Sequence, residues 1–167
     1  GYTRNPYDPR RNAGGSSGGT AAAVAANFAA VGMGSDTCGS IRIPAANNNL
    51  FGLRVTQGLS SRDGIIPLSH TQDVGGPIAR SVIDLATVLD ATVGTDPDDE
   101  QTAGADEHVP ATFEDFLRPD ALQGARLGLL TDYLVTAAPF GEVSRVIRTA
   151  AAAMAESGAE IVELEID

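Results

Sequence analysis

The chain has 167 residues, of which 43% are hydrophobic and 20% are charged, a composition typical of globular proteins and not of disordered ones. A formal net charge of −11 at pH 7 argues against nucleic acid or an anionic membrane surface as a partner, since both would repel the protein. No apolar run approaches the roughly 20 residues that cross a bilayer, and the single cysteine excludes an internal disulfide.

The first half of the chain is predicted to mix short strands with helices. Residues 1–13 contain prolines and arginines without periodicity and are expected to be irregular. A helix is expected over residues 17–30, where alanine, the best helix former, dominates. The sequence then predicts a short strand over residues 31–34, a structured loop over 35–44 and a second strand over 51–55.

The second half is predicted to continue this alternation. A helix is expected over residues 81–93, where Ser81 and Asp84 resemble a capping box, and residues 95–111 are expected to be an acidic, solvated connection. A strand over 126–130, a helix over 141–157 that stops at Gly158, and a strand over 160–166 follow. The helix over 141–157 is expected to bury Val143, Val146, Ile147, Ala150 and Met154. Strands alternating with helices predict an α/β fold with a central mixed, largely parallel twisted sheet flanked by helices.

Two serine-centred loops lie close together in the sequence, around Ser16 and Ser40. A phosphate-binding loop is excluded, because all eleven Lys+Arg residues are arginines and the motif requires a lysine. Gly14-x-Ser16-x-Gly18 formally fits a nucleophile elbow, but no buried strand precedes it, and only His70 and His108 could complete a triad. The remaining interpretation uses both serines, one as nucleophile and one as proton relay, with backbone amides of residues 35–40 facing the acyl oxygen.

The two loops belong to a longer set of matching segments. These are Gly14-Gly-Ser-Ser-Gly-Gly, Gly34-Ser-Asp-Thr-Cys-Gly-Ser-Ile-Arg-Ile-Pro-Ala, Phe51-Gly-Leu-Arg-Val-Thr and Gln72-Asp-Val-Gly-Gly-Pro-Ile-Ala-Arg-Ser. In these segments the chain resembles the amidase signature hydrolases, closely over residues 4–94 and more loosely to its end. Within that family it is more similar to peptide amidases than to the amidotransferase component that acts on misacylated tRNA.

The resemblance implies a role for each of these residues. Ser40 matches the acylated nucleophile, and Ser16 matches the middle member of a Ser–cis-Ser–Lys triad, in which the peptide bond before it is cis. The amides of Thr37, Cys38, Gly39 and Ser40 would form the oxyanion hole, with Ser17, Asp36 and Arg42 as supporting residues; an ordinary surface ion pair between Asp36 and Arg42 stays open. The family usually has glycine where Cys38 stands, so this side chain either adds strain at a positive φ or is tolerated.

The family's general-base lysine lies upstream of the first glycine loop, and this chain contains no lysine. Residues 1–167 are therefore expected to be the central part of one amidase signature domain, without its N-terminal and C-terminal parts and inactive alone. The implied activity is hydrolysis of small-molecule or peptide amides; the alternative is a non-catalytic fragment or degenerate homologue. No cofactor or metal site is expected, the oligomeric state stays open, and the compartment is not assigned, with the cytoplasm favoured.

Overall fold

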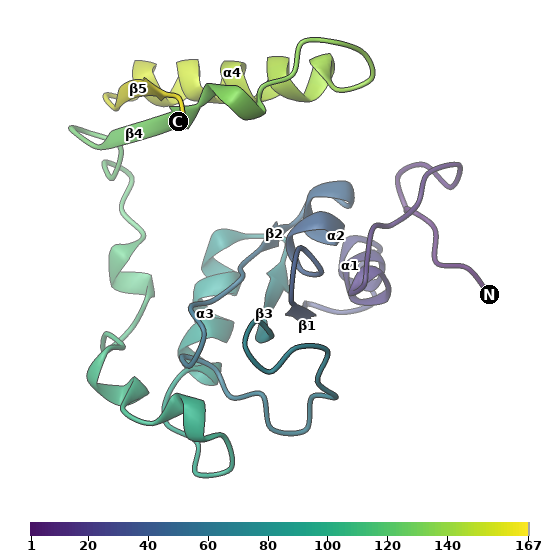
Figure 1. Cartoon of the computed structure of the whole chain (residues 1–167), viewed down its shortest axis with the longest axis vertical. Helices are drawn as coiled ribbons and strands as arrows, with labels where there is room; N and C mark the ends of the chain where they lie inside the picture. The colour runs from purple at the N-terminus through teal and green to yellow at the C-terminus, as the bar shows by residue number, and fades with distance from the viewer. Residues whose placement is uncertain (167) are drawn as a thin grey trace. The chain divides into compact units, whose positions relative to one another are not determined.

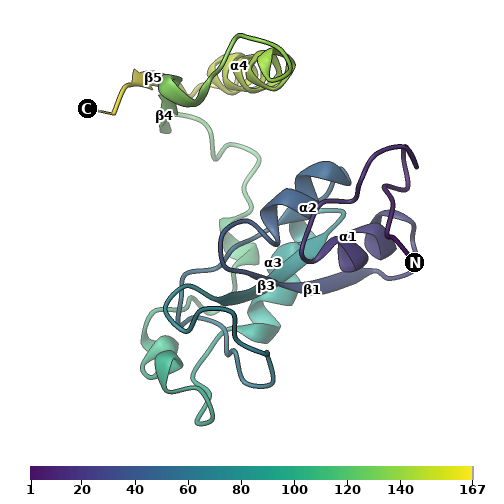
Figure 2. The same cartoon turned by 45° about the vertical axis from the view of Figure 1, so that its right-hand side comes forward.

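The computed structural model describes residues 1–166, which form one compact unit of residues 1–115 and a second that begins at Phe116. The first unit contains a three-stranded sheet of β1 (Val31–Asp36), β3 (Val74–Ala79) and β2 (Phe51–Gly52), in the order β1-β3-β2 (Figure 1). Its helices are α1 (Gly18–Ala25), α2 (Arg42–Asn47) and α3 (Val82–Thr92). Helices α1 and α2 contact each other, and α1 and α3 both pack against β3 (Figure 2).

Strand β3 is the centre of this unit. It pairs antiparallel with β1, from Val31 opposite Ala79 to Asp36 opposite Val74, and antiparallel with β2. All six of its residues are buried. Its side chains join two apolar clusters, one built from Ala21, Ile41 and Ile78 with Leu50 against it, and one from Val55, Val74 and Leu89 with Leu53, Val93 and Phe113 against it. Burial of these side chains is the main force that holds the sheet and helices together.

The expectation of a largely parallel sheet is not confirmed in the described residues, because the sheet of the first unit is antiparallel throughout. Strands β1 and β2 are both antiparallel to β3 and so run in the same direction, with α2 between them in the sequence. The alternation of strand and helix therefore indicated their direction correctly. It missed β3, which lies between them and whose Gly75-Gly76-Pro77 sequence is typical of a turn.

The local boundaries differ from the expected ones at the two serine loops. Helix α1 ends at Ala25 and not at residue 30, because Asn27 has a positive φ of 62° and turns the chain out of the helix. Strand β1 extends to Asp36, and the expected loop over residues 35–44 is shortened further by α2, which begins at Arg42. Strand β2 covers only Phe51–Gly52. The turn that carries Ser40 is therefore a short one between a strand and a helix.

Two predicted features of the first unit fare differently. Helix α3 forms as expected, with the Ser81 side chain accepting a hydrogen bond from the Asp84 amide. The expectation that residues 95–111 are solvated is wrong for Asp99 and Thr102, which are 8% and 0% exposed. This segment forms the 3₁₀ helices η1 (Glu100–Thr102) and η2 (Ala105–Glu107), and its Asp99 is buried because it pairs with Arg62.

The second unit pairs β4 (Arg126–Leu130) in parallel with β5 (Glu160–Leu164), with α4 (Gly141–Glu156) between them in the sequence. Short 3₁₀ helices lie at Glu114–Phe116 (η3) and Thr131–Tyr133 (η4). The expected burial of the apolar side of α4 is wrong, since Val143 and Val146 are 58% and 54% exposed and Ser144 is the buried residue of the helix. A two-stranded sheet offers too little surface to cover a sixteen-residue helix. Within residues 1–166, no helix combines the length and apolar character that a membrane span requires.

Candidate active site

Ser16 lies in the loop that leads into α1 and is exposed to solvent. The peptide bond between Gly15 and Ser16 is cis, the geometry that the resemblance implies at this position. Gly14 precedes it with a φ of +75°, and a side chain there would lie 2.9 Å from the backbone of Pro44. Glycine is therefore needed at residue 14 both for the backbone conformation and for the close approach of α2.

Ser40 lies in the turn between β1 and α2, and hydrogen bonds join this turn to the Ser16 loop. The amide of Ser17 donates to the carbonyl oxygen of Ser40 at 3.1 Å. The Ser17 hydroxyl lies 3.3 Å from both the amide nitrogen and the carbonyl oxygen of Ser35, accepting from the first and donating to the second. Ser17 therefore links the start of α1 to both β1 and the Ser40 turn, so the residue after Ser16 lies directly against the segment that carries Ser40.

A buried carboxylate holds the Ser40 turn in place. The side chain of Asp36 is fully buried and accepts hydrogen bonds from the amides of Gly39 (2.7 Å), Ile41 (3.1 Å) and Arg42 (3.4 Å). The guanidinium of Arg42 adds two more, at 3.1 and 3.0 Å, and Nε of Arg54 lies 3.5 Å from Oδ1. Burial alone would raise the pKa of Asp36, but these donors outweigh it and hold that pKa far below its usual range. The contact between Asp36 and Arg42 is therefore not an ordinary surface ion pair.

The backbone amides of the turn are not equivalent. The Gly39 amide is already bonded to Asp36, whereas those of Thr37, Cys38 and Ser40 donate to no acceptor within residues 1–166. Cys38 is exposed, and it is not among the residues other than glycine with a positive φ, which in the described part of the chain are Asn27 and Asn49. The backbone at residue 38 thus accommodates a side chain without left-handed strain.

Two residues that contact this turn have no assigned role in the sequence-based prediction. Arg54 reaches Asp36 from the segment after β2, and Asp73 accepts a hydrogen bond from the hydroxyl of Thr37. Both lie within segments that carry the family resemblance, Phe51-Gly-Leu-Arg-Val-Thr and Gln72-Asp-Val-Gly-Gly-Pro, and that position is the signal that could have identified them. Their contact with the turn depends on the pairing of β2 and β3, which periodicity does not reveal.

Ser16 borders a depression of about 350 Å³ that Met33, Gly34, Ser35 and Ile65 also line, together with Ser17. His70, considered as a substitute base, instead lines a separate cavity of about 220 Å³ with Arg62, Asp73 and Asp99. Within residues 1–166, no group of three or more His, Cys, Asp or Glu side chains is arranged to hold a metal ion. The Ser16 depression is open on the side of Ile65, a residue of the segment between Ser60 and β3.

Comparison with known proteins is consistent with this geometry. The family model described as Amidase matches residues 1–167. The chain belongs to the amidase family. It is 45% identical over 128 residues to a probable amidase of Arabidopsis thaliana, a match that covers 76% of this chain and 25% of the relative.

Two further relatives match almost the whole chain. The first component of the glutamyl-tRNA(Gln) amidotransferase of Thermus thermophilus is 41% identical over 162 residues, covering 97% of this chain and 33% of the relative. The structure of the native peptide amidase from Stenotrophomonas maltophilia is also 41% identical, with a TM-score of 0.83 over 98% of this chain and 33% of that protein. The equal identities do not separate these two kinds of amidase relative. The chain spans between a quarter and a third of the length of these three proteins.

Proposed function

We propose that this chain carries the nucleophile and the oxyanion hole of an enzyme that hydrolyses linear amides of small molecules or peptides. The observation that carries the proposal is the hydrogen bond from the Ser17 amide to the Ser40 carbonyl, at 3.1 Å, which holds the two serine loops together. Membership of the amidase family supports the reaction class. Both compact units would then belong to one amidase domain of a longer protein.

In this proposal Ser40 is the nucleophile and Ser16 relays its proton. The Ser40 oxygen attacks the amide carbon while the proton moves to Ser16, which passes its own proton to a base. The carbon–nitrogen bond then breaks, the amine or ammonia leaves with a proton, and an ester to Ser40 remains. Water hydrolyses that ester, releasing the acid and returning a proton to Ser40. The exposure of Ser16 and the depression beside it would give an amide access to this pair.

The oxyanion that forms on the acyl oxygen needs preorganised N–H donors. The amides of Thr37, Cys38 and Ser40 are the candidates, since none of them has an acceptor among the described residues. The Gly39 amide is instead bonded to Asp36 at 2.7 Å, so we propose that it shapes the turn and does not bind the substrate. Loss of one oxyanion donor in other hydrolases lowers kcat by roughly 10²–10³-fold.

The base that would accept the Ser16 proton is not a lysine of this chain, which has none. Arginine cannot replace it, because its pKa is too high for it to release a proton near neutral pH. We propose that a lysine elsewhere in the full-length protein supplies this function, as in the family it resembles, and that residues 1–167 alone do not hydrolyse amides. His70 is a poor substitute because it lines a different cavity from Ser16.

The same lack of a lysine favours one alternative function, that of a homologue that has kept the fold and lost the chemistry. An experiment on the full-length protein separates the two. A fluorophosphonate probe is added to the wild type and to the variants Ser40→Ala and Ser16→Ala, and the labelled peptide is identified by mass spectrometry. Ammonia release from a panel of primary amides is measured in parallel. Ser157→Ala, an exposed serine of the second unit, is the matched control.

The proposal predicts a label on Ser40, no label in Ser40→Ala, and labelling slowed by roughly 10²–10⁴-fold in Ser16→Ala, the usual value of general acid–base assistance. A label on Ser16 with Ser40 free would reverse the two roles. A folded full-length protein that neither takes the label nor releases ammonia would support the non-catalytic alternative.

A further inference from the structure

Asp73 is a buried carboxylate, 6% exposed, at the end of the central strand and next to the proposed oxyanion turn. Because Asp36 is paired with Val74 in the β1–β3 ladder, the next residue of β1 and the preceding residue of β3 leave the sheet side by side. These two residues are Thr37 and Asp73, and the Thr37 hydroxyl donates a hydrogen bond to Asp73 Oδ1. The ladder itself therefore brings this carboxylate to the turn.

The other oxygen of Asp73 binds a different part of the chain. Oδ2 accepts hydrogen bonds from the amides of Leu68 at 2.7 Å and Ser69 at 2.8 Å. The hydrogen bond from Thr37, together with these amides, lowers the pKa of Asp73, which keeps the carboxylate charged at neutral pH. Hydrogen bonds to an ionised acceptor are stronger than neutral ones, so Asp73 is suited to holding the turn and the 61–73 segment together.

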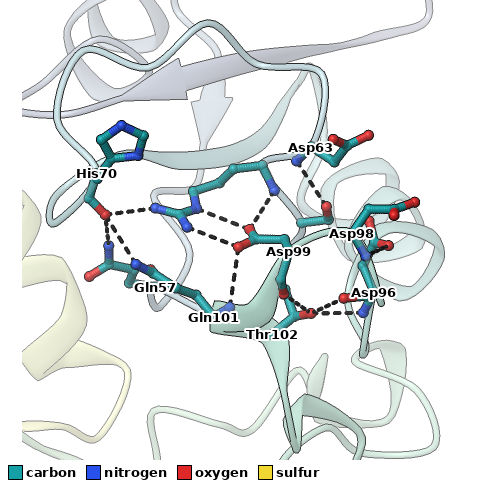
Figure 3. A network of polar contacts seen from close by, with 10 residues as sticks. Gln57, Asp63, His70, Asp96, Asp98, Asp99, Gln101 and Thr102 are labelled. Atoms are coloured by element: carbon teal, nitrogen blue, oxygen red, sulfur yellow. Dashed lines mark hydrogen bonds and ion pairs between the residues drawn. The ribbon is translucent and has the colours of Figure 1, made fainter.

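The 61–73 segment is itself fixed by a second ion pair (Figure 3). The guanidinium of Arg62 donates to both oxygens of Asp99, at 3.0 and 2.9 Å, and the Arg62 amide adds a third bond at 2.9 Å. Nη1 of Arg62 also donates to the carbonyl oxygen of His70 at 2.8 Å, which Gln57 and Gln101 contact as well. The base of the segment is thereby held, so the Leu68 and Ser69 amides are a firm support for Asp73.

The two carboxylates hold different parts of the turn. Asp36 binds the amides of Gly39, Ile41 and Arg42, all of them after Cys38. Asp36 accepts no hydrogen bond from Thr37, whose side chain is held by Asp73. The first two of the candidate oxyanion donors, Thr37 and Cys38, therefore depend for their orientation on the contact with Asp73.

We propose that Asp73 is a positioning residue for amide hydrolysis, which through the Thr37 hydroxyl orients the amides of Thr37 and Cys38 toward the acyl oxygen. This inference rests on the proposed function of Ser40. A displacement of these amides weakens the bonds to the transition state more than the binding of the ground state. Loss of the contact should therefore lower kcat and leave KM nearly unchanged.

The test uses the full-length enzyme and removes the contact from either side. Thr37→Val keeps the size of the side chain and removes the hydroxyl, Thr37→Ser keeps the hydroxyl, and Asp73→Asn removes the charge. Thr71→Val, at an exposed threonine of the same segment, is the matched control. For each variant, kcat and KM on a primary amide, the rate of fluorophosphonate labelling of Ser40 and the melting temperature are measured.

We expect Thr37→Val to lower kcat and the labelling rate by about 10- to 100-fold, the effect of misplacing a reacting group by a fraction of an ångström to one ångström, with KM little changed. Thr37→Ser should recover most of both rates, and Asp73→Asn should resemble Thr37→Val. A folded Thr37→Val enzyme with wild-type kcat, or one altered only in KM, would overturn the inference. If Asp73→Asn does not fold, Thr37→Val and Thr37→Ser decide alone. Absence of any label on Ser40 in the wild type would instead refute the proposed function, so the two failures are distinguishable.

Discussion

The guanidinium of Arg42 donates two parallel hydrogen bonds to the carboxylate of Asp36, Nε to Oδ2 at 3.1 Å and Nη2 to Oδ1 at 3.0 Å. One partner is fully buried and the other is half exposed, with side-chain exposures of 0% and 53%. The pair is therefore asymmetric: water can replace the arginine, but nothing can replace the carboxylate that also binds three backbone amides.

The first prediction follows from this asymmetry. Asp36→Asn should lower the free energy of unfolding of the full-length protein by about 3 kcal/mol, because it leaves buried donors without their acceptor. Arg42→Ala should cost less, since Arg54 and the amides still compensate the charge of Asp36. Urea denaturation of both variants measures the difference. An equal or larger loss in Arg42→Ala would show that the guanidinium, and not the carboxylate, is the main support.

The second prediction concerns acid stability. The pKa of Asp99 is far below its usual range because of the hydrogen bonds from Arg62, and the pKa values of Asp36 and Asp73 are lowered as well. A carboxyl group with a lowered folded-state pKa stabilises the protein above its unfolded pKa, about 3.9, and this stabilisation is lost as the pH falls through the folded value. The melting temperature should therefore drop steeply below about pH 4.

Asp99→Asn tests the contribution of one of these groups. Its melting temperature should depend less on pH in the acid range than that of the wild type, because one of the protons taken up on unfolding is removed. Asp98→Asn is the matched control, as it changes the neighbouring exposed carboxyl group. An unchanged acid slope in Asp99→Asn would contradict the role assigned to the pair with Arg62.

The third prediction concerns the backbone before Ser40. Gly39 has a φ of +142°, and an added Cβ would lie 2.7 Å from Cδ1 of Ile43. Gly39→Ala should therefore destabilise the protein by about 1–3 kcal/mol and reduce kcat, because the turn must distort. The double variant Gly39→Ala with Ile43→Val removes the contact atom and leaves the unfavourable φ. Full recovery of stability in the double variant would show that crowding, and not the backbone conformation, requires glycine.

The fourth prediction concerns the start of α3. The Ser81 hydroxyl accepts from the Asp84 amide at 3.0 Å and donates to the Asp84 carboxylate at 2.7 Å. Ser81→Ala should cost about 1 kcal/mol in the free energy of unfolding, the usual value of an N-cap, while Ser81→Thr should cost little. Both values are read from denaturant midpoints. A neutral Ser81→Ala would mean that packing against β3 alone determines where the helix begins.

The comparison of sequence with structure divides along the range of the interactions. Helix α3, helix α4 and strand β4 were predictable because capping and periodicity act between residues close in the sequence. Strand β3 was not, since Gly75, Gly76 and Pro77 disfavour a strand locally, and tertiary packing decides the outcome. The exposed apolar side of α4 was missed for a related reason: periodicity indicates which side is apolar, not whether other residues are present to cover it.

The candidate site shows the same division. The neighbouring positions of the Ser16 and Ser40 segments were expected from the family resemblance, and the cradle around Asp36 was partly expected through Arg42. The contacts of Arg54 and Asp73 were not, because they come from segments that reach the turn only through the pairing of β2 and β3. Residues that support a site from distant strands are difficult to assign from one sequence.

The central place of β3 has a consequence for the order of events during synthesis. Strands β1 and β2 are each hydrogen-bonded to β3 and not to each other, so the sheet cannot form until Ala79 has left the ribosome. Until then Thr37 also lacks Asp73, and the nascent chain holds both serine loops without the strand that supports them. Contacts that close such long loops form slowly. Chaperone dependence and aggregation during translation should therefore be governed by the interval between synthesis of β1 and synthesis of β3, and pausing of the ribosome within that interval would prolong exposure of the apolar side chains of α1 and β1.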